Sequence, residues 1–141
     1  MITTILKREY LLCELDDEIP VLKHRWLRHP TSEEFKDGLT SMYGEYIGIK
    51  DNYEDLKWLA DTVLIGELDT EVKEWLNSDW DSMLFIEAGV RTHAVIKGND
   101  LYADYPMEIF KMISSKKYKD LGIKLEVFEN EEKAYEWLKG N

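Results

Sequence analysis

The sequence predicts an α/β protein in which a largely parallel sheet carries an antiparallel hairpin at its N-terminal side. Short apolar runs alternate with amphipathic segments of helical period over most of the chain, which is typical of a parallel sheet with helical crossovers. The first three apolar runs follow one another with no helix between them, which indicates antiparallel pairing. The length of 141 residues fits a single domain, covering residues 1–141.

Three strands are predicted in the N-terminal part, over residues 3–8, 10–16 and 19–27. A polar turn at Asp16, Asp17 and Glu18 separates the second strand from the third. Pro20 has no N–H to donate, so we expect the third strand either to lie at an edge of the sheet or to begin pairing after this residue. Cys13, the one cysteine, lies in an alternating apolar stretch, which indicates a buried apolar residue and not a reactive thiol.

The first helix is predicted to begin after Thr31. Thr31 and Glu34 have the spacing of a capping box, in which each side chain bonds to the other residue's backbone. Apolar residues then recur at three- and four-residue steps and form one face: Phe35, Leu39, Met42, Tyr43 and Tyr46. Gly38 and Gly44 lower the helix propensity, so this helix depends on packing against a sheet.

Strands and helices alternate over the rest of the chain. The predicted strands cover residues 56–63, 91–97 and 124–128. Helices are predicted from Asp69 to about Phe85, from Pro106 to about Ser115, and after the N-cap residue Asn130. The order is therefore β-β-β-α-β-α-β-α-β-α, with right-handed crossovers between parallel strands. Four tryptophans fall on faces that the periodicity assigns to the interior: Trp58, Trp75, Trp80 and Trp137.

Composition limits the range of partners. The formal net charge of −11 repels phosphate backbones, so we expect no nucleic-acid partner. No apolar run approaches the roughly 20 residues that a membrane-spanning helix needs. The N-terminal residues lack the apolar core of a signal peptide. We therefore expect a soluble, cytoplasmic protein.

Residues 23–29 form a basic island in this acidic chain. In a strand, Lys23 and Arg25 share one face, while His24 and Trp26 share the other. One interpretation places Lys23 and Arg25 on a solvated face, where they balance nearby carboxylates. The other interpretation is a small patch for an anionic ligand or an acidic partner.

A second group of candidate residues lies where strands end and helices begin. Asp61 and Thr62 close an apolar strand, and Asp69 and Thr70 open the following helix. Such junctions are where α/β folds place ligands and regulatory contacts. We expect the Asp61 carboxylate to be held by backbone N–H groups of the following loop.

Two tyrosines form a third candidate surface. Tyr102 and Tyr105 lie just before the helix that is predicted to begin at Pro106. They either line a pocket or an interface, or they are half-buried structural residues.

No residue pattern in the chain carries catalytic chemistry. The three histidines, His24, His29 and His93, lack metal-ligand spacing. Nucleophile elbows, phosphate-binding loops and dinucleotide fingerprints do not occur in the sequence. We therefore expect a protein that is not an enzyme and has no cofactor or metal. His24 is interpreted as a hydrogen-bonded, half-buried histidine.

The positions of several aromatic residues and of one strand end resemble those of a known protein family over nearly the whole chain. They are Trp26 at the end of the third strand, Phe35 in the first helix, the strand end Trp58-Leu59-Ala60-Asp61, and Trp75 in the next helix. With this arrangement the chain resembles small bacterial STAS-like proteins, whose fold is that of the anti-sigma-factor antagonists and is related to the CRAL-TRIO lipid-binding fold.

The resemblance implies a non-catalytic regulatory or protein-interaction module, with a protein partner or a homodimer. The CRAL-TRIO relation implies an alternative, a carrier or sensor of a small lipid or anionic ligand. An enzyme of unrecognised type is the third alternative.

In the antagonists, a phosphorylated serine follows an aspartate at the start of the helix after a central strand. Asp69 and Thr70 match that position, but the usual Asp-Ser-Ser-Gly pattern is absent. Glu67 and Glu71 would also repel an added phosphate. We therefore predict that Thr70 is not a phosphorylation site.

Overall fold

The computed structural model describes residues 1–98 and 101–141, with side chains described for residues 1–98 and 106–141. Within these residues, six strands form one sheet whose spatial order follows the chain. The strands are β1 (Ile2–Arg8), β2 (Leu11–Asp16), β3 (Val21–Trp26), β4 (Lys57–Asp61), β5 (Thr92–Ile96) and β6 (Lys124–Phe128). Pairing is antiparallel from β1 to β3 and parallel from β3 to β6. The predicted α/β architecture, with an antiparallel N-terminal hairpin on a parallel sheet, is confirmed.

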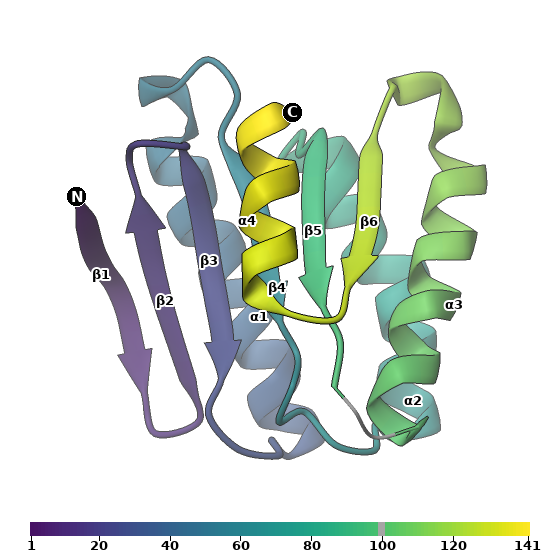
Figure 1. The fold of residues 1–141 in the computed structure, drawn as a ribbon. Helices are drawn as coiled ribbons and strands as arrows, with labels where there is room; N and C mark the ends of the chain where they lie inside the picture. Colours follow the sequence, from purple (N-terminus) through teal and green to yellow (C-terminus); the bar gives the residue numbers. More distant parts are fainter. Residues whose placement is uncertain (99–100) are drawn as a thin grey trace.

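Helices cover both faces of the sheet. The main helices are α1 (Ser32–Ile49), α2 (Thr70–Trp75), α3 (Leu101–Lys117) and α4 (Glu131–Gly140), with π-helical segments η2 (Leu76–Trp80) and η3 (Met83–Glu87) and 3₁₀ turns η1 (Lys50–Asn52) and η4 (Lys119–Leu121). Each parallel connection moves one strand further along the sheet, so right-handed crossovers place their helices on the same face. Figure 1 shows α4 in front of the sheet and α1 behind it.

The two faces of the sheet have separate cores. On the face that packs on α1, η2, η3 and α3, large aromatic residues dominate: Trp26, Phe35, Trp58, Trp80, Phe85 and Phe110. On the opposite face a small core joins the sheet to α4: Val21, Leu59, Ala94, Ile96, Ala134 and Leu138. The strands β3, β4 and β5 are covered on both sides, which explains their nearly continuous burial.

Local signals at the helix ends are confirmed. The Thr31 side chain accepts from the Glu34 N–H at 3.1 Å, and Glu34 accepts from the Thr31 N–H at 2.9 Å. Asn130 accepts from the Lys133 N–H at 2.9 Å and caps α4. Gly38 has a packing role, because a Cβ there would lie 2.9 Å from both Leu11 and Trp26.

Several predicted boundaries are wrong. The helix predicted to begin at Pro106 begins instead at Leu101, so Pro106 lies inside α3. The helix tolerates this proline because it removes a single helical hydrogen bond, while Met107 and Phe110 still pack into the core. The segment after Asp69 is helical but contains two π-helical stretches.

The third strand is not at an edge, since β3 lies between β2 and β4. Its pairing begins at Val21, after Pro20, as the other alternative predicted. Pro20 contributes its carbonyl, which accepts from the Lys57 N–H at 3.1 Å.

Candidate functional site

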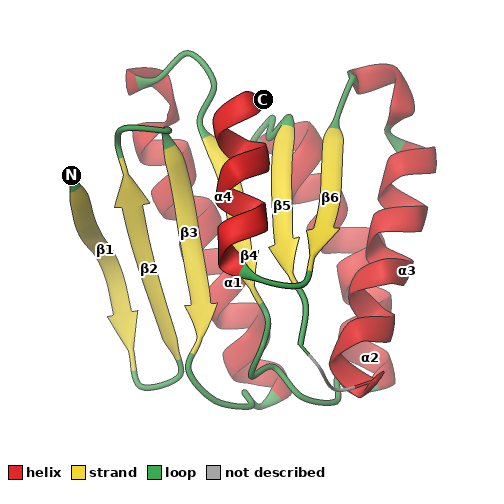
Figure 2. Ribbon diagram, viewed as in Figure 1, coloured by secondary structure: helices red, strands yellow, loops and turns green. Residues whose placement is uncertain are grey.

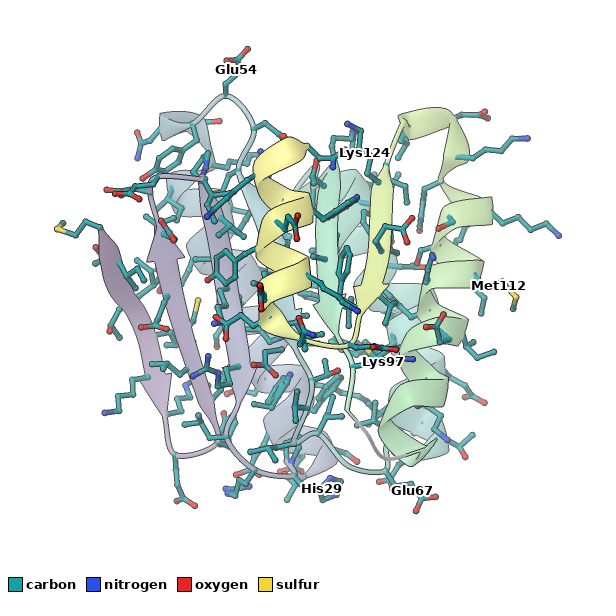
Figure 3. The ribbon with its side chains drawn as sticks, viewed as in Figure 1. His29, Glu54, Glu67, Lys97, Met112 and Lys124 are labelled. Carbon is teal, nitrogen blue, oxygen red and sulfur yellow. The ribbon has the colours of Figure 1, made fainter. Side chains whose placement is uncertain are left out.

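The loops that follow β3 and β4 meet at one end of the sheet. Both strands run in the same direction, so their carboxyl ends lie side by side. Figure 2 shows these loops at the end where the β3 and β4 arrows point. Figure 3 shows His29, from the first loop, and Glu67, from the second, at this same end. We call residues 62–69 the β4–α2 loop.

The start of the β4–α2 loop is held by hydrogen bonds to the sheet. Asp61 accepts from the Val63 N–H at 3.2 Å, as expected for a carboxylate that closes a strand. The backbone N–H and the hydroxyl of Thr62 both donate to the carbonyl of Ile96, at 2.9 and 2.8 Å. The Ile65 N–H donates to the Thr62 carbonyl at 3.2 Å and closes a turn.

The middle and end of the β4–α2 loop are joined to the segment after β3. His29 Nδ1 lies 2.5 Å from the carbonyl oxygen of Ile65. A carbonyl accepts only, so Nδ1 carries the hydrogen in this contact. The Ser32 hydroxyl donates to the Asp69 carboxylate at 2.6 Å. Asp69 therefore holds two helix starts together, and its side chain makes no capping bond within α2.

These contacts determine which side chains of the loop face outward. Ile65 and Leu68 are buried, at 1% and 5% exposure. Val63 and Leu64 are 42% and 54% exposed, although they are aliphatic. Leu27, at the end of the neighbouring strand, is 37% exposed. The loop thus presents two aliphatic side chains to solvent from a backbone that is fixed on both sides.

Acidic side chains follow this aliphatic pair along the chain. Glu67, Asp69 and Glu71 are exposed, and Glu71 pairs with Lys36 at 2.7 Å. A groove of about 270 Å³ lies beside the loop, and its lining includes His29, Phe35, Glu67, Asp69 and Val72. Thr70 is exposed in the first turn of α2. The candidates Asp61, Thr62, Asp69 and Thr70 all lie at this end of the sheet.

Lys23 and Arg25 lie on the other face of the sheet, next to α4. Lys23 pairs with Glu131, and its ammonium lies 5.4 Å from the centre of the Tyr135 ring. Arg25 donates to Asp61 at 3.2 Å and to Glu131 at 3.5 Å. The expectation of a solvated face is wrong for Lys23, which is 6% exposed because α4 covers it.

A groove of about 220 Å³ opens beside these cations. Its charged lining also contains Glu14, Asp16 and Glu131. The two cations are already paired with carboxylates of the chain, so the groove offers an anion no excess positive charge. Lys23 and Arg25 thus neutralise nearby carboxylates, as one of the two interpretations predicted. The interpretation as an anionic-ligand patch is less well supported.

Between the sheet and the helices lies a small aromatic cavity of about 30 Å³. His24 and His93 line it from either side of Trp58, with ring centres 5.8 and 6.3 Å from the Trp58 ring. Burial lowers the pKa of both imidazoles to about 3, so both are neutral near pH 7. A cavity of this size holds one or two water molecules, whereas ligand sites usually enclose about 300–1,000 Å³.

The expectation that His24 is half-buried is wrong. His24 is 2% exposed, and its Nδ1 has no hydrogen-bond partner within the described part of the chain. The ring makes T-shaped contacts with Trp26 and Trp58, with ring centres 5.8 Å apart in each pair. Cys13 is buried as predicted, and burial raises the pKa of its thiol to about 12.

The side chains of Tyr102 and Tyr105 lie outside the described residues, and the backbone at both positions belongs to α3. In the described part of the chain, no group of histidine, cysteine and acidic side chains has an arrangement that could hold a metal ion. The helices searched over the same residues include none with the length and apolar character that crossing a bilayer requires.

Sequence reasoning missed three residues that shape the loop: His29, Ser32 and Gly66. Gly66 has φ +71°, and a Cβ there would lie 2.7 Å from His29 Nδ1. A glycine in a short link between strand and helix was a usable signal for a left-handed backbone. His29 and Ser32 carried no signal, since their partners lie 36 and 37 residues away in sequence.

Comparison of the chain with models of protein families, with curated proteins and with solved structures gave no match.

Proposed function

We propose that this chain is a non-catalytic regulatory module of STAS-like type that binds a protein partner through the β4–α2 loop. One observation supports the proposal above the others. Hydrogen bonds within the protein hold the Val63 N–H, the Thr62 hydroxyl and the Ile65 carbonyl, while Val63 and Leu64 face solvent from a fixed backbone. The order of strands and helices and the positions of Trp26, Phe35 and Trp58 support the likeness to STAS-like proteins.

The physical argument rests on the cost of ordering a binding segment. Fixing a flexible loop on binding costs conformational entropy, and a loop that is already held avoids most of that cost. Exposed aliphatic side chains contribute by leaving water when a partner covers them. In this loop, the hydrogen bonds to Ile96, His29 and Ser32 supply the order, and Val63 and Leu64 supply the apolar contact.

A groove lies beside the end of the same loop. Its volume of about 270 Å³ would receive one or two side chains of a partner. Glu67 and Asp69 line it, which disfavours a small anion and favours a partner with a basic side chain near its apolar contact. A carrier of lipid is less well supported, because the aromatic cavity of about 30 Å³ is far smaller than an acyl chain requires.

Site-specific photo-crosslinking tests the proposal. A photoreactive amino acid replaces Leu64, and a matched control replaces Met112, which is 61% exposed on α3. Figure 3 shows Met112 away from His29 and Glu67. In cells of the natural source, we expect a discrete protein adduct from position 64 and none from position 112.

A second part of the experiment tests whether the adduct depends on the exposed aliphatic side chains. With the photoreactive residue kept at position 64, Val63→Asp should reduce the adduct formed by the natural partner at least about tenfold, while the far-UV circular dichroism stays unchanged because the Val63 side chain faces solvent. Equal adducts from positions 64 and 112 would contradict the proposal. A lipid retained by the purified protein in native mass spectrometry would support the carrier alternative instead.

A further inference from the structure

The strand β1 leaves one side of the sheet open. It pairs with β2 alone, and no described residue lies against its other side. Figure 2 shows β1 as the outermost element of the sheet at the end where the chain begins. The Met1 carbonyl accepts from the Asp17 N–H at 3.3 Å, so Met1 faces β2. Alternation along the strand then turns the N–H and C=O groups of Ile2 and Thr4 toward the open side.

The side chains near this open edge suit strand pairing. Residues 1–6 contain no charged side chain, and Ile2, Thr3, Thr4 and Ile5 are β-branched. Met1 and Ile2 are 76% and 60% exposed. Edge strands that avoid pairing usually carry a charge, a proline or a β-bulge. Residues 1–6 contain no charged side chain and no proline, and the register shift of β1 lies after Thr4.

The far end of β1 is held firmly. Arg8 pairs with Asp37 and donates to the Ser41 hydroxyl at 3.0 Å, which fixes the strand to α1. The register with β2 shifts between Thr4 and Leu6, so a regular edge extends only over the first residues of β1. A pairing partner is therefore restricted to this short segment.

We propose that a second copy of this chain pairs with the open edge of β1 in antiparallel orientation, around a two-fold axis at Thr3. Ile2 of each copy then lies opposite Thr4 of the other, and each such pair exchanges two backbone hydrogen bonds. The pairing joins two six-stranded sheets into one continuous sheet. A two-fold arrangement is closed, so it stops at the dimer.

Charge supports a second copy as the occupant. The acidic turn of Asp16, Asp17 and Glu18 lies at the N-terminal end of β1, and Lys7 lies at the other end. Antiparallel pairing brings Lys7 of one copy within two strand spacings, about 10 Å, of the acidic turn of the other. Extended lysine and glutamate side chains span that distance. Lys7 has no ion-pair partner among the residues that the structure describes. Glu18 lies 3.6 Å from the Met1 ammonium, but its side chain is 83% exposed and stays accessible to a second cation.

The opposite edge of the sheet is a poorer partner for β1. The helix α3 lies beside β6, and Lys111 on α3 pairs with Glu126 on β6 at 2.9 Å. Pairing of β1 with β6 of another copy would also be head-to-tail and would form a ring or a filament, not a dimer. The short regular segment of β1 makes the interface small, so the dimer is expected to be weak and concentration-dependent.

Sedimentation equilibrium of the purified chain, from about 1 µM to about 1 mM, tests the proposal. The expected result is a reversible increase from the monomer mass to twice that mass. Thr4→Pro removes an N–H on the open edge without removing a bond to β2, and it should abolish the dimer. The unfolding midpoint in urea checks that this variant still folds.

A charge exchange tests the register and does not depend on the proline variant. Lys7→Glu alone and Glu18→Lys alone should each weaken dimerisation at least about tenfold, and the double variant should restore it. Lys116→Glu, an exposed lysine on α3, makes the same change in net charge as Lys7→Glu and should weaken dimerisation less. A chain that stays monomeric throughout, polymers beyond the dimer, or a dimer insensitive to both Thr4→Pro and Lys7→Glu would overturn the proposal.

Discussion

The imidazole of His29 donates to the carbonyl oxygen of Ile65 across 2.5 Å, and this bond joins the segments that follow two neighbouring parallel strands. The next residue, Gly66, has φ +71° and lies directly beneath the same imidazole. The backbone conformation of Gly66 and the position of His29 therefore depend on each other. This pair therefore fixes the loop immediately after Val63 and Leu64.

Gly66→Ala should destabilise the protein more than Gly122→Ala. Both glycines have positive φ, +71° and +72°, so both variants carry the left-handed penalty of about 1–2 kcal/mol. A Cβ at Gly122 meets nothing within 4 Å, whereas a Cβ at Gly66 lies 2.7 Å from His29 Nδ1. We expect the urea-measured free energy of unfolding to fall by about 1 kcal/mol more for Gly66→Ala. Equal losses would show that His29 moves aside without cost.

Asp61→Ala should lower the free energy of unfolding by about 1–2 kcal/mol. The substitution leaves the Val63 N–H without its acceptor and removes the ion pair with Arg25. Asp61→Asn is the matched control, because its amide oxygen still accepts from Val63. The ion pair itself contributes little, since the Arg25 side chain is 39% exposed. An unchanged urea midpoint in Asp61→Ala would show that this carboxylate is replaceable by water.

The elements that could be predicted from the sequence are those with local causes. The capping box of Thr31 and Glu34 involves residues three apart, and the strand from Lys124 to Phe128 is bounded by its own polar neighbours. The start of α3 could not be predicted, because Pro106 is a strong local signal that tertiary packing of Met107 and Phe110 overrides. The burial of Lys23 likewise depends on α4, which begins 108 residues later with Glu131.

The candidate site divides in the same way. Asp61 could be placed at a strand end because an apolar run stops at a carboxylate. Its ion pair with Arg25 required knowledge that β3 and β4 are parallel neighbours with these two residues in register. The bond from Ser32 to Asp69 crosses between two helix starts, and no periodicity within either helix reports it.

Two buried histidines should make the protein sensitive to mild acid. Burial lowers the pKa of His24 and His93 to about 3 in the folded state, against about 6.5 in the unfolded chain. The unfolded state therefore binds protons first, and stability decreases as the pH falls below about 6.5 toward 3. Between pH 7.5 and pH 5, we expect each histidine to reduce the free energy of unfolding by about 2 kcal/mol.

Urea unfolding at pH 7.5 and at pH 5 measures this effect. The loss of unfolding free energy between pH 7.5 and pH 5 should be about half as large in His24→Gln and in His93→Gln as in the natural chain. This difference between two pH values is compared within each variant, so a change in its stability at pH 7.5 does not affect the test. The comparison stays above pH 5 because carboxylates begin to titrate below it. Variants that lose as much stability between the two pH values as the natural chain would show that the imidazoles are not the groups responsible.

Thr70 provides the last prediction, on the regulatory switch that the STAS-like resemblance suggests. Its side chain is exposed in the first turn of α2, where a helix dipole favours negative charge. Glu67, Asp69 and Glu71 surround the position, and the nearby cation Lys36 is already paired with Glu71 at 2.7 Å. A phosphate dianion there would meet three carboxylates and no free arginine in the adjoining sequence, so its repulsion outweighs the dipole. We expect Thr70→Glu to leave the urea midpoint within about 0.5 kcal/mol of the natural chain, and phosphopeptide mapping of protein from its natural source to find Thr70 unmodified. Stoichiometric phosphate on Thr70 would contradict this prediction and support a phosphorylation switch at the start of α2.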